Sequence, residues 1–101
     1  MRNSHQKYSV YILTNKPKGI LYIGVTGNIN DRMNRHIKGK GSLFTKRYQL
    51  KTLVYLEYFD FINEAIAREK QLKNWHRQWK INLIEQNNTE WEDLYDPLGI
   101  G

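Results

Sequence analysis

The sequence predicts an α/β domain of the α+β type, in which a small antiparallel sheet is combined with helices. Three short runs rich in Val, Ile, Leu and Tyr predict strands, at residues 8–13, 20–25 and 52–59. After the second and third runs, apolar residues recur at helical spacing. A length of 101 residues suits one domain with a modest core. We therefore expect a single domain over residues 1–101.

The first two runs predict a β-hairpin. Residues 14–19 connect them, and Pro17 and Gly19 in this connection are typical of a turn. We expect the side chains of Tyr11 and Tyr22 to face the same side of the hairpin. Gly24 is unusual, because a glycine weakens a strand unless backbone or ligand must approach closely there.

A helix is predicted after Asn28, which suits the N-cap position. Apolar residues at positions 29, 33 and 37 follow helical spacing, and glycines at 39 and 41 end the pattern. Arg32 and His36 are four residues apart, so they share one face of this helix. One helix therefore presents a guanidinium and an imidazole together.

Residues 38–51 are basic and contain two glycines, which predicts a loop or a loosely structured arm. Basic side chains position a phosphate backbone, and aromatic rings stack on unpaired bases. Phe44 and Tyr48 either serve this purpose or anchor the arm to the core. Residues 52–59 alternate apolar and mixed side chains, and we expect them to join the hairpin as a third strand.

One long helix is predicted over residues 61–83, capped by Asp60. Glu69 falls inside its apolar face. A lone inward carboxylate is costly unless it is paired or binds a cation. An ion pair with Arg32 is one explanation of Glu69, and a bound metal ion is the other. Beyond this catalytic body of residues 7–84, residues 85–98 predict an acidic helical cover.

The charge of the chain is uneven. All 16 Lys and Arg residues lie in residues 1–84 with five acidic residues, which gives this part a net charge of +11. Such a basic body favours a polyanion as partner, most simply nucleic acid, although scattered surface lysines are the plainer explanation. The chain has no cysteine, no apolar run near the roughly 20 residues of a membrane span, and no signal-peptide pattern at the N-terminus. We expect a cytoplasmic protein.

The candidate chemical groups are two tyrosines on adjacent strands, an Arg/His pair and an inward Glu. P-loop, GxGxxG, serine-elbow and HExxH motifs are absent. What remains fits hydrolysis of a phosphodiester. Glu69 would hold one Mg²⁺ as an oxygen ligand, and Arg32 would bind the non-bridging phosphate oxygens.

Two triplets carry a family resemblance. Ser9-Val10-Tyr11 and Tyr22-Ile23-Gly24 resemble the paired motif of the GIY-YIG nuclease superfamily, with SVY in place of GIY. The resemblance continues through Arg32 and His36, the FTKRY segment and Arg68-Glu69-Lys70. The later KNWHRQWKINLI and WEDLY stretches resemble small single-domain bacterial members.

The resemblance implies a three-stranded antiparallel sheet flanked by helices. It also implies roles for single residues: Tyr11 as general base, Tyr22 as a second phenol that organises the water and metal shell, Arg32 as phosphate binder, His36 as proton shuttle or phosphate contact, Glu69 as the ligand of Mg²⁺ or Mn²⁺, Gly24 as room beside Tyr22, and Lys46 in support. An asparagine also acts in many relatives, and Asn74 and Asn82 are both candidates.

Together these features predict a Mg²⁺-dependent DNA endonuclease that acts in DNA repair, recombination or processing. We expect a monomer that prefers single-stranded or branched DNA, with RNA as an alternative substrate. A non-catalytic nucleic-acid-binding module with the same fold is the alternative function, and a structural or interaction protein is a third. The residues expected to contact nucleic acid are Lys38, Lys40, Phe44, Lys46, Arg47, Tyr48, Lys70, Lys73 and Arg77.

Overall fold

Three strands form one antiparallel sheet in the computed structural model, which describes residues 7–95. The elements follow one another as β1 (Tyr8–Thr14), β2 (Leu21–Thr26), α1 (Ile29–Ile37), α2 (Leu43–Arg47), β3 (Thr52–Phe59), α3 (Ile62–Asn74) and α4 (Arg77–Asn87). The strand order is β2-β1-β3. Both the predicted hairpin and its third strand are therefore confirmed, and β1 is the central strand.

The central position of β1 explains why its sequence is almost continuously apolar. Because β1 pairs with a neighbour on each side and is covered on both faces, all its residues from Ser9 to Thr14 are buried. A strand covered in this way is expected to be almost continuously apolar rather than alternating. Tyr11 lies in register with Gly24 on β2 and with Leu56 on β3. This register places the first tyrosine directly opposite the glycine of the second triplet.

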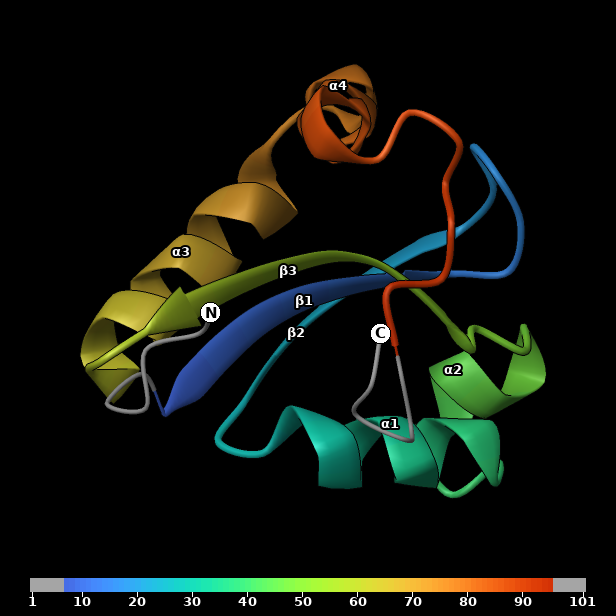
Figure 1. The fold of residues 1–101 in the computed structure, drawn as a ribbon, viewed down its shortest axis with the longest axis horizontal. Coiled ribbons are helices and arrows are strands. Elements are labelled where there is room, and N and C mark those ends of the chain that lie inside the picture. Colours follow the sequence, from blue (N-terminus) through green and yellow to red (C-terminus); the bar gives the residue numbers. More distant parts are fainter. Residues whose placement is uncertain (1–6, 96–101) are drawn as a thin grey trace.

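Helices cover the two faces of the sheet, with α3 and α4 on one side and α1 and α2 on the other (Figure 1). Each face has its own core. The core on the α3/α4 side comprises Val10, Ile12, Ile23, Val54, Ala65, Leu72, Ile81, Ile84 and Trp91. The core on the α1/α2 side comprises Tyr11, Leu13, Ile29, Met33, Leu50 and Leu53, with Tyr22 packed against it. Tyr11 and Tyr22 thus face the same side, as predicted.

The single long helix predicted over residues 61–83 is wrong. The chain leaves helical geometry at Trp75 and His76, whose ψ angles are 150° and 148°, and two helices result. Leu72 and Ile81 are nine residues apart, so in one continuous helix they would point in opposite directions. Both are buried in the same core, which only a break between them allows. The break leaves Trp79 53% exposed, although in one continuous helix it would lie on the same face as Leu72, seven residues earlier.

Two predicted helix starts have different outcomes. Asn28 caps α1 as predicted, because its side chain accepts a hydrogen bond from the backbone N–H of Asp31 at 3.0 Å. Asp60 does not cap α3, whose N-cap position is Phe61 without a side-chain hydrogen bond.

The segment predicted as a loop or arm contains α2. Ser42 caps this short helix by accepting from the backbone N–H of Thr45 at 3.2 Å. A serine N-cap starts a helix even where glycines precede it, and the two glycines were therefore a misleading signal for the whole segment.

The predicted helical cover over residues 85–98 is also wrong, because α4 ends at Asn87 and no helix follows within residues 88–95. These residues form an irregular strap along the start of β3. The backbone N–H of Leu94 donates to the Leu53 carbonyl at 2.7 Å, and the Asp93 carboxylate accepts from the Leu53 N–H. The Asn88 amide donates to the Val54 carbonyl. The polar groups of the strap thus pair with a strand instead of with a helix of their own; residues 96–98 of the predicted cover lie outside the described residues.

No helix within residues 7–95 combines the length and the apolar character that crossing a membrane requires.

Candidate active site

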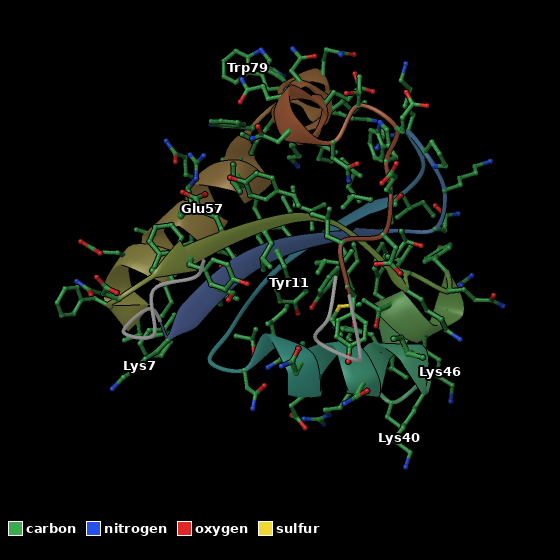
Figure 2. All side chains as sticks on the ribbon, viewed as in Figure 1. Lys7, Tyr11, Lys40, Lys46, Glu57 and Trp79 are labelled. Atoms are coloured by element: carbon green, nitrogen blue, oxygen red, sulfur yellow. The ribbon has the colours of Figure 1, made fainter. Side chains whose placement is uncertain are left out.

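The Tyr11 ring lies over Gly24, its register partner on β2. A Cβ atom at Gly24 would come within 2.5 Å of the Tyr11 hydroxyl oxygen, far inside normal contact distance. The expectation that Gly24 makes room beside Tyr22 is therefore corrected, since the space is filled by Tyr11. Figure 2 shows Tyr11 on the side of the sheet that faces α1. The missing side chain of Gly24 lets the phenol reach across β2 towards that helix.

Arg32 and His36 meet the Tyr11 hydroxyl from α1, and their predicted common face is confirmed. Arg32 Nη1 donates to the Tyr11 hydroxyl at 3.4 Å, and His36 Nε2 lies 3.4 Å from the same oxygen. The His36 ring centroid is 6.0 Å from those of both Tyr11 and Tyr22. The fold therefore brings the guanidinium of Arg32 and the imidazole of His36 to the hydroxyl of Tyr11, with the Tyr22 ring beside the imidazole.

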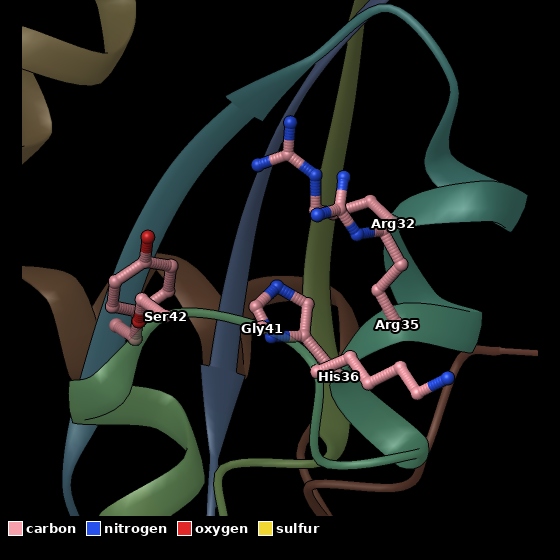
Figure 3. Close-up of a pocket in the computed structure, with 7 residues that line it drawn as sticks. Arg32, Arg35, His36, Gly41 and Ser42 are labelled. Carbon is pink, nitrogen blue, oxygen red and sulfur yellow. The ribbon is translucent and has the colours of Figure 1, made fainter.

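A pocket of about 330 Å³ opens beside this cluster (Figure 3). Arg32, Arg35 and His36 extend into it from α1. Three of its lining residues carry a positive charge and none carries a carboxylate, so its field favours an anion. Tyr11 is fully buried and lies behind the pocket. The complete lining is Tyr22, Arg32, Arg35, His36, Lys40, Gly41 and Ser42.

The surroundings fix the protonation of the two central groups. Burial raises the pKa of Tyr11 to about 12, although the Arg32 guanidinium acts in the opposite direction. Burial also lowers the pKa of His36, and the charges of Arg32 and Arg35 lower it further. Near neutral pH, Tyr11 is therefore a protonated phenol and His36 a neutral imidazole. The Arg32 guanidinium therefore does not bring the Tyr11 pKa below its ordinary value in the free protein, because desolvation of the buried phenol outweighs its charge.

Glu69 turns inward from α3, as predicted, and its side chain is only 15% exposed. Its carboxylate forms an ion pair with Lys73 Nζ at 2.9 Å, one helical turn away. The predicted alternative, an ion pair with Arg32, is therefore wrong. The Glu69 charge contributes to the raised pKa of Tyr11, so the carboxylate acts electrostatically on the phenol. Within residues 7–95, no three His, Cys, Asp or Glu side chains gather as a metal site.

The two aromatic residues of the predicted arm are exposed, Phe44 to 45% and Tyr48 to 37%. Phe44 stacks on Tyr22 with ring centroids 6.3 Å apart, and Tyr48 lies 5.0 Å from Phe44. Arg47 lies over the Tyr48 ring at 5.5 Å. These three rings form a continuous series from the pocket to the surface of α2. Neither Phe44 nor Tyr48 is a buried core anchor.

The basic residues expected to contact nucleic acid divide into two groups. Lys38, Lys40, Lys46 and Arg47 are exposed near the pocket end of α1 and α2, and Lys40 lines the pocket; Figure 2 shows Lys40 and Lys46 at this end. Lys70, Lys73 and Arg77 lie on α3 and α4 instead.

Two of these three helical residues have structural partners. Arg77 Nη2 donates to the carbonyls of Lys18 and Gly19 and so fastens the β1–β2 connection to α4. Lys73 is the partner of Glu69. Neither Asn74 nor Asn82 lines the pocket, and Asn82 accepts a hydrogen bond from Gln78.

The sequence interpretation missed four residues of the site: Arg35, Gly41, Ser42 and Thr45. Arg35 follows Arg32 by three positions, a helical spacing that could have identified it. Thr45 Oγ1 lies 3.2 Å from His36 Nδ1, and a Cβ at Gly41 would lie 2.4 Å from the same nitrogen. Thr45 lies in the FTKRY segment and at the Ser42-x-x-Thr45 helix start, but neither pattern by itself indicates a contact with a histidine.

Comparison with known proteins agrees with this arrangement. Residues 7–82 match the GIY-YIG catalytic domain. A UPF0213 protein of Staphylococcus haemolyticus is 40% identical over 80 residues, which cover 79% of this chain and 96% of that protein. One from Staphylococcus saprophyticus is 39% identical over the same shares. The solution NMR structure of a UPF0213 protein from Bacillus halodurans has a TM-score of 0.54 and 29% identity, and covers 85% of this chain and 90% of that one. The chain therefore belongs to the GIY-YIG nuclease superfamily.

Proposed function

We propose that this protein is a divalent-metal-dependent endonuclease that hydrolyses phosphodiester bonds in DNA. The observation that carries the proposal is the Tyr11 hydroxyl, which meets Arg32 and His36 directly behind a cationic pocket. Membership of a nuclease superfamily supports the same reaction class. A phosphodiester fits the pocket because it is an anion that gains charge as it is cleaved.

Binding of the scissile phosphate is assigned to the cations of α1. Arg32 offers a planar guanidinium that donates two parallel hydrogen bonds to phosphate oxygens. Arg35 and Lys40 line the same pocket and add positive charge where the pentavalent transition state becomes more negative. This electrostatic stabilisation acts at full strength only because the surrounding groups are already held in place.

Proton transfer is assigned to Tyr11 and His36. Tyr11 is the proposed general base, but its pKa of about 12 means that it must first lose its own proton. His36 Nε2 is within reach of that proton and would accept it, becoming an imidazolium that can release a proton to solvent in the pocket it lines. The Tyr11 phenolate would then take the proton of the attacking water. Tyr22, which also lines the pocket, would position the attacking water.

Glu69 fits a hydrated Mg²⁺ or Mn²⁺ that takes one protein carboxylate and completes its shell with water and phosphate oxygens. Such an ion would act as a Lewis acid on the phosphate. Lys73 now neutralises this carboxylate and would have to leave it. Its side chain is 53% exposed, so its release into solvent is inexpensive.

The exposed rings of Phe44 and Tyr48 favour a substrate with unpaired bases. Aromatic rings beside basic side chains are typical of surfaces that bind single strands, where each stacked base contributes about 1–3 kcal/mol. We therefore propose single-stranded or branched DNA as substrate, within repair, recombination or processing. A non-catalytic module that only binds nucleic acid is the second candidate, and the pairing of Glu69 with Lys73 favours it if the pair persists in the presence of metal.

The test uses labelled single-stranded, duplex, flap and forked DNA, and RNA, with Mg²⁺ or Mn²⁺. The wild-type protein is compared with Glu69→Gln and with the control Glu64→Gln, which changes an exposed acid on the same helix. We expect metal-dependent cleavage by the wild type and the control, and none by Glu69→Gln. Binding without cleavage by all three proteins would favour the non-catalytic module, and equal cleavage by all three would remove Glu69 from the mechanism.

A further inference from the structure

We infer that Thr45 is a positioning residue that holds His36 in one tautomer, with the proton on Nδ1 and the lone pair of Nε2 directed at the Tyr11 hydroxyl. This inference rests on the proposed function for its catalytic meaning, but it concerns a hydrogen-bond arrangement that can be measured without any activity. Thr45 belongs to neither of the two triplets and does not line the pocket.

The hydrogen bonds of Thr45 assign the tautomer. Thr45 Oγ1 donates to the Ser42 carbonyl at 3.0 Å, an atom that can only accept. The same oxygen accepts from the Ser42 hydroxyl at 3.1 Å. Because a hydroxyl has one proton and two lone pairs, its remaining capacity is to accept. The third neighbour, His36 Nδ1 at 3.2 Å, must therefore donate and carry the proton.

The Tyr11 side of the imidazole leads to the same assignment. Tyr11 is fully buried, and its oxygen accepts from Arg32. If Nε2 carried the proton, it would donate to this oxygen as well, and the phenol proton would have no acceptor among the contacts of the described residues. A buried hydroxyl without an acceptor is costly. With the proton on Nδ1, the Tyr11 O–H donates to Nε2, and every polar group of the chain Ser42–Thr45–His36–Tyr11 is satisfied.

Gly41 allows Thr45 to reach the histidine. A Cβ at Gly41 would lie 2.4 Å from His36 Nδ1 and 2.8 Å from Thr45 Oγ1, so a side chain there would enter the space where these two atoms meet. The close approach of residue 41 places the start of α2 against the buried imidazole. Both Thr45 and His36 are less than 5% exposed, and water therefore competes little for their hydrogen bond.

The tautomer decides what His36 can do in the reaction. With an unprotonated Nε2, His36 is an acceptor that draws the proton from Tyr11, which is the direction that a general base requires. With a protonated Nε2, it would donate to the phenol and could not accept its proton. This arrangement follows the general rule that the hydrogen bond at one ring nitrogen of a histidine decides which of the two nitrogens carries the proton.

The decisive measurement is the ¹⁵N NMR spectrum of the His36 ring, assigned by its loss in a His36→Asn variant. The wild type is expected to show a protonated Nδ1 and an unprotonated Nε2. Thr45→Val keeps the shape of the side chain without the hydroxyl, and both nitrogens should then move towards intermediate shifts. Thr45→Ser should restore the wild-type pattern. If Thr45→Val does not fold, Thr45→Ala makes the same test.

Ser42→Ala is the matched control for a merely structural effect, because it removes the N-cap of α2 but leaves the Thr45 hydroxyl beside His36. We expect it to lower stability without changing the tautomer. In cleavage assays, Thr45→Val should lower kcat by about 10- to 100-fold with little change in KM, the size of effect known for partners that orient metal-binding histidines. A protonated Nε2 in the wild type, or a tautomer unchanged by Thr45→Val, would overturn the inference whether or not the protein cleaves DNA.

Discussion

Replacing Gly24 by alanine tests the packing of the site most directly. The new methyl group would lie 2.5 Å from both Cζ and the hydroxyl oxygen of Tyr11, about 1 Å closer than van der Waals contact permits. The Tyr11 ring cannot move away freely, because it is fully buried and its hydroxyl is hydrogen-bonded to Arg32 and His36 of α1. Overpacking of this kind costs about 1–3 kcal/mol. The free energy of unfolding should fall by about this amount.

The sign of the effect depends on Tyr11 alone. In a strand, replacing glycine by alanine at a compatible backbone conformation stabilises a protein by about 0.4–1 kcal/mol, because the unfolded chain loses freedom. In a Tyr11→Leu background the clash is removed, so the same substitution at Gly24 should be neutral or stabilising. The coupling between the two positions is then expected to reach about 2 kcal/mol or more.

Urea unfolding of the four proteins in this double-mutant cycle measures the coupling. A fall of 2 kcal/mol corresponds to a decrease in Tm of about 8–16 °C for a domain of this size, which thermal unfolding would detect independently. If Gly24→Ala had the same effect in both backgrounds, the close approach of Tyr11 to Gly24 would not be what requires the glycine.

The remaining predictions concern pH, metal and substrate. Because the pKa of His36 is lowered in the folded protein, its contribution to stability is present above pH 6.5 and is lost as the pH falls below that value; His36→Asn should remove this dependence in urea titrations. Because the pKa of Tyr11 is raised to about 12, stability should fall as the pH rises from 10 to 12, and less so in Tyr11→Phe. Lys73→Met should lower the Mg²⁺ concentration for half-maximal cleavage by about two- to fivefold, the effect of losing an exposed ion pair, and an unchanged requirement would show that the pair does not compete with metal. Phe44→Ala should weaken binding of single-stranded DNA by about 1–3 kcal/mol in fluorescence titrations, whereas Leu43→Ala on the same helix, 87% exposed, should not; equal losses would exclude specific stacking.

The strands were predictable because their signal is local. Each is a short apolar run between turn residues, whereas the strand order, with β3 beside β1, is known from the structure. The break between α3 and α4 was not predictable, because no proline or glycine lies there. The break is a consequence of tertiary packing, because Leu72 and Ile81 are buried in the same core and one continuous helix would point them in opposite directions. The strap of residues 88–95 has a similar origin, since its hydrogen-bond partners lie on β3, 34 and 40 residues away in the sequence.

The candidate site likewise contains features that the sequence predicted and features that it did not. The spacing of Arg32 and His36 and the family triplets were sufficient to bring the phenol, guanidinium and imidazole together. The direction of the Tyr11 pKa shift was not predictable, because burial of the ring outweighs the nearby charges and the depth of burial cannot be taken from the sequence. Thr45 and Gly41 were missed because helical periodicity describes one helix at a time, whereas their contacts with His36 join α2 to α1.

The strap also has a consequence for how copies of this protein meet one another. A three-stranded sheet has two outer edges, and a free edge is a template for pairing with another chain. The strap covers the first part of the outer edge of β3. The backbone N–H and carbonyl of Leu53 and the carbonyl of Val54 all form hydrogen bonds with the strap. The strap also contains two exposed acidic residues, Glu92 and Asp93, and charge beside a sheet edge discourages pairing. Residues 88–95 thus leave fewer unpaired backbone groups on the outer edge of β3, which disfavours edge-to-edge association between copies of the protein.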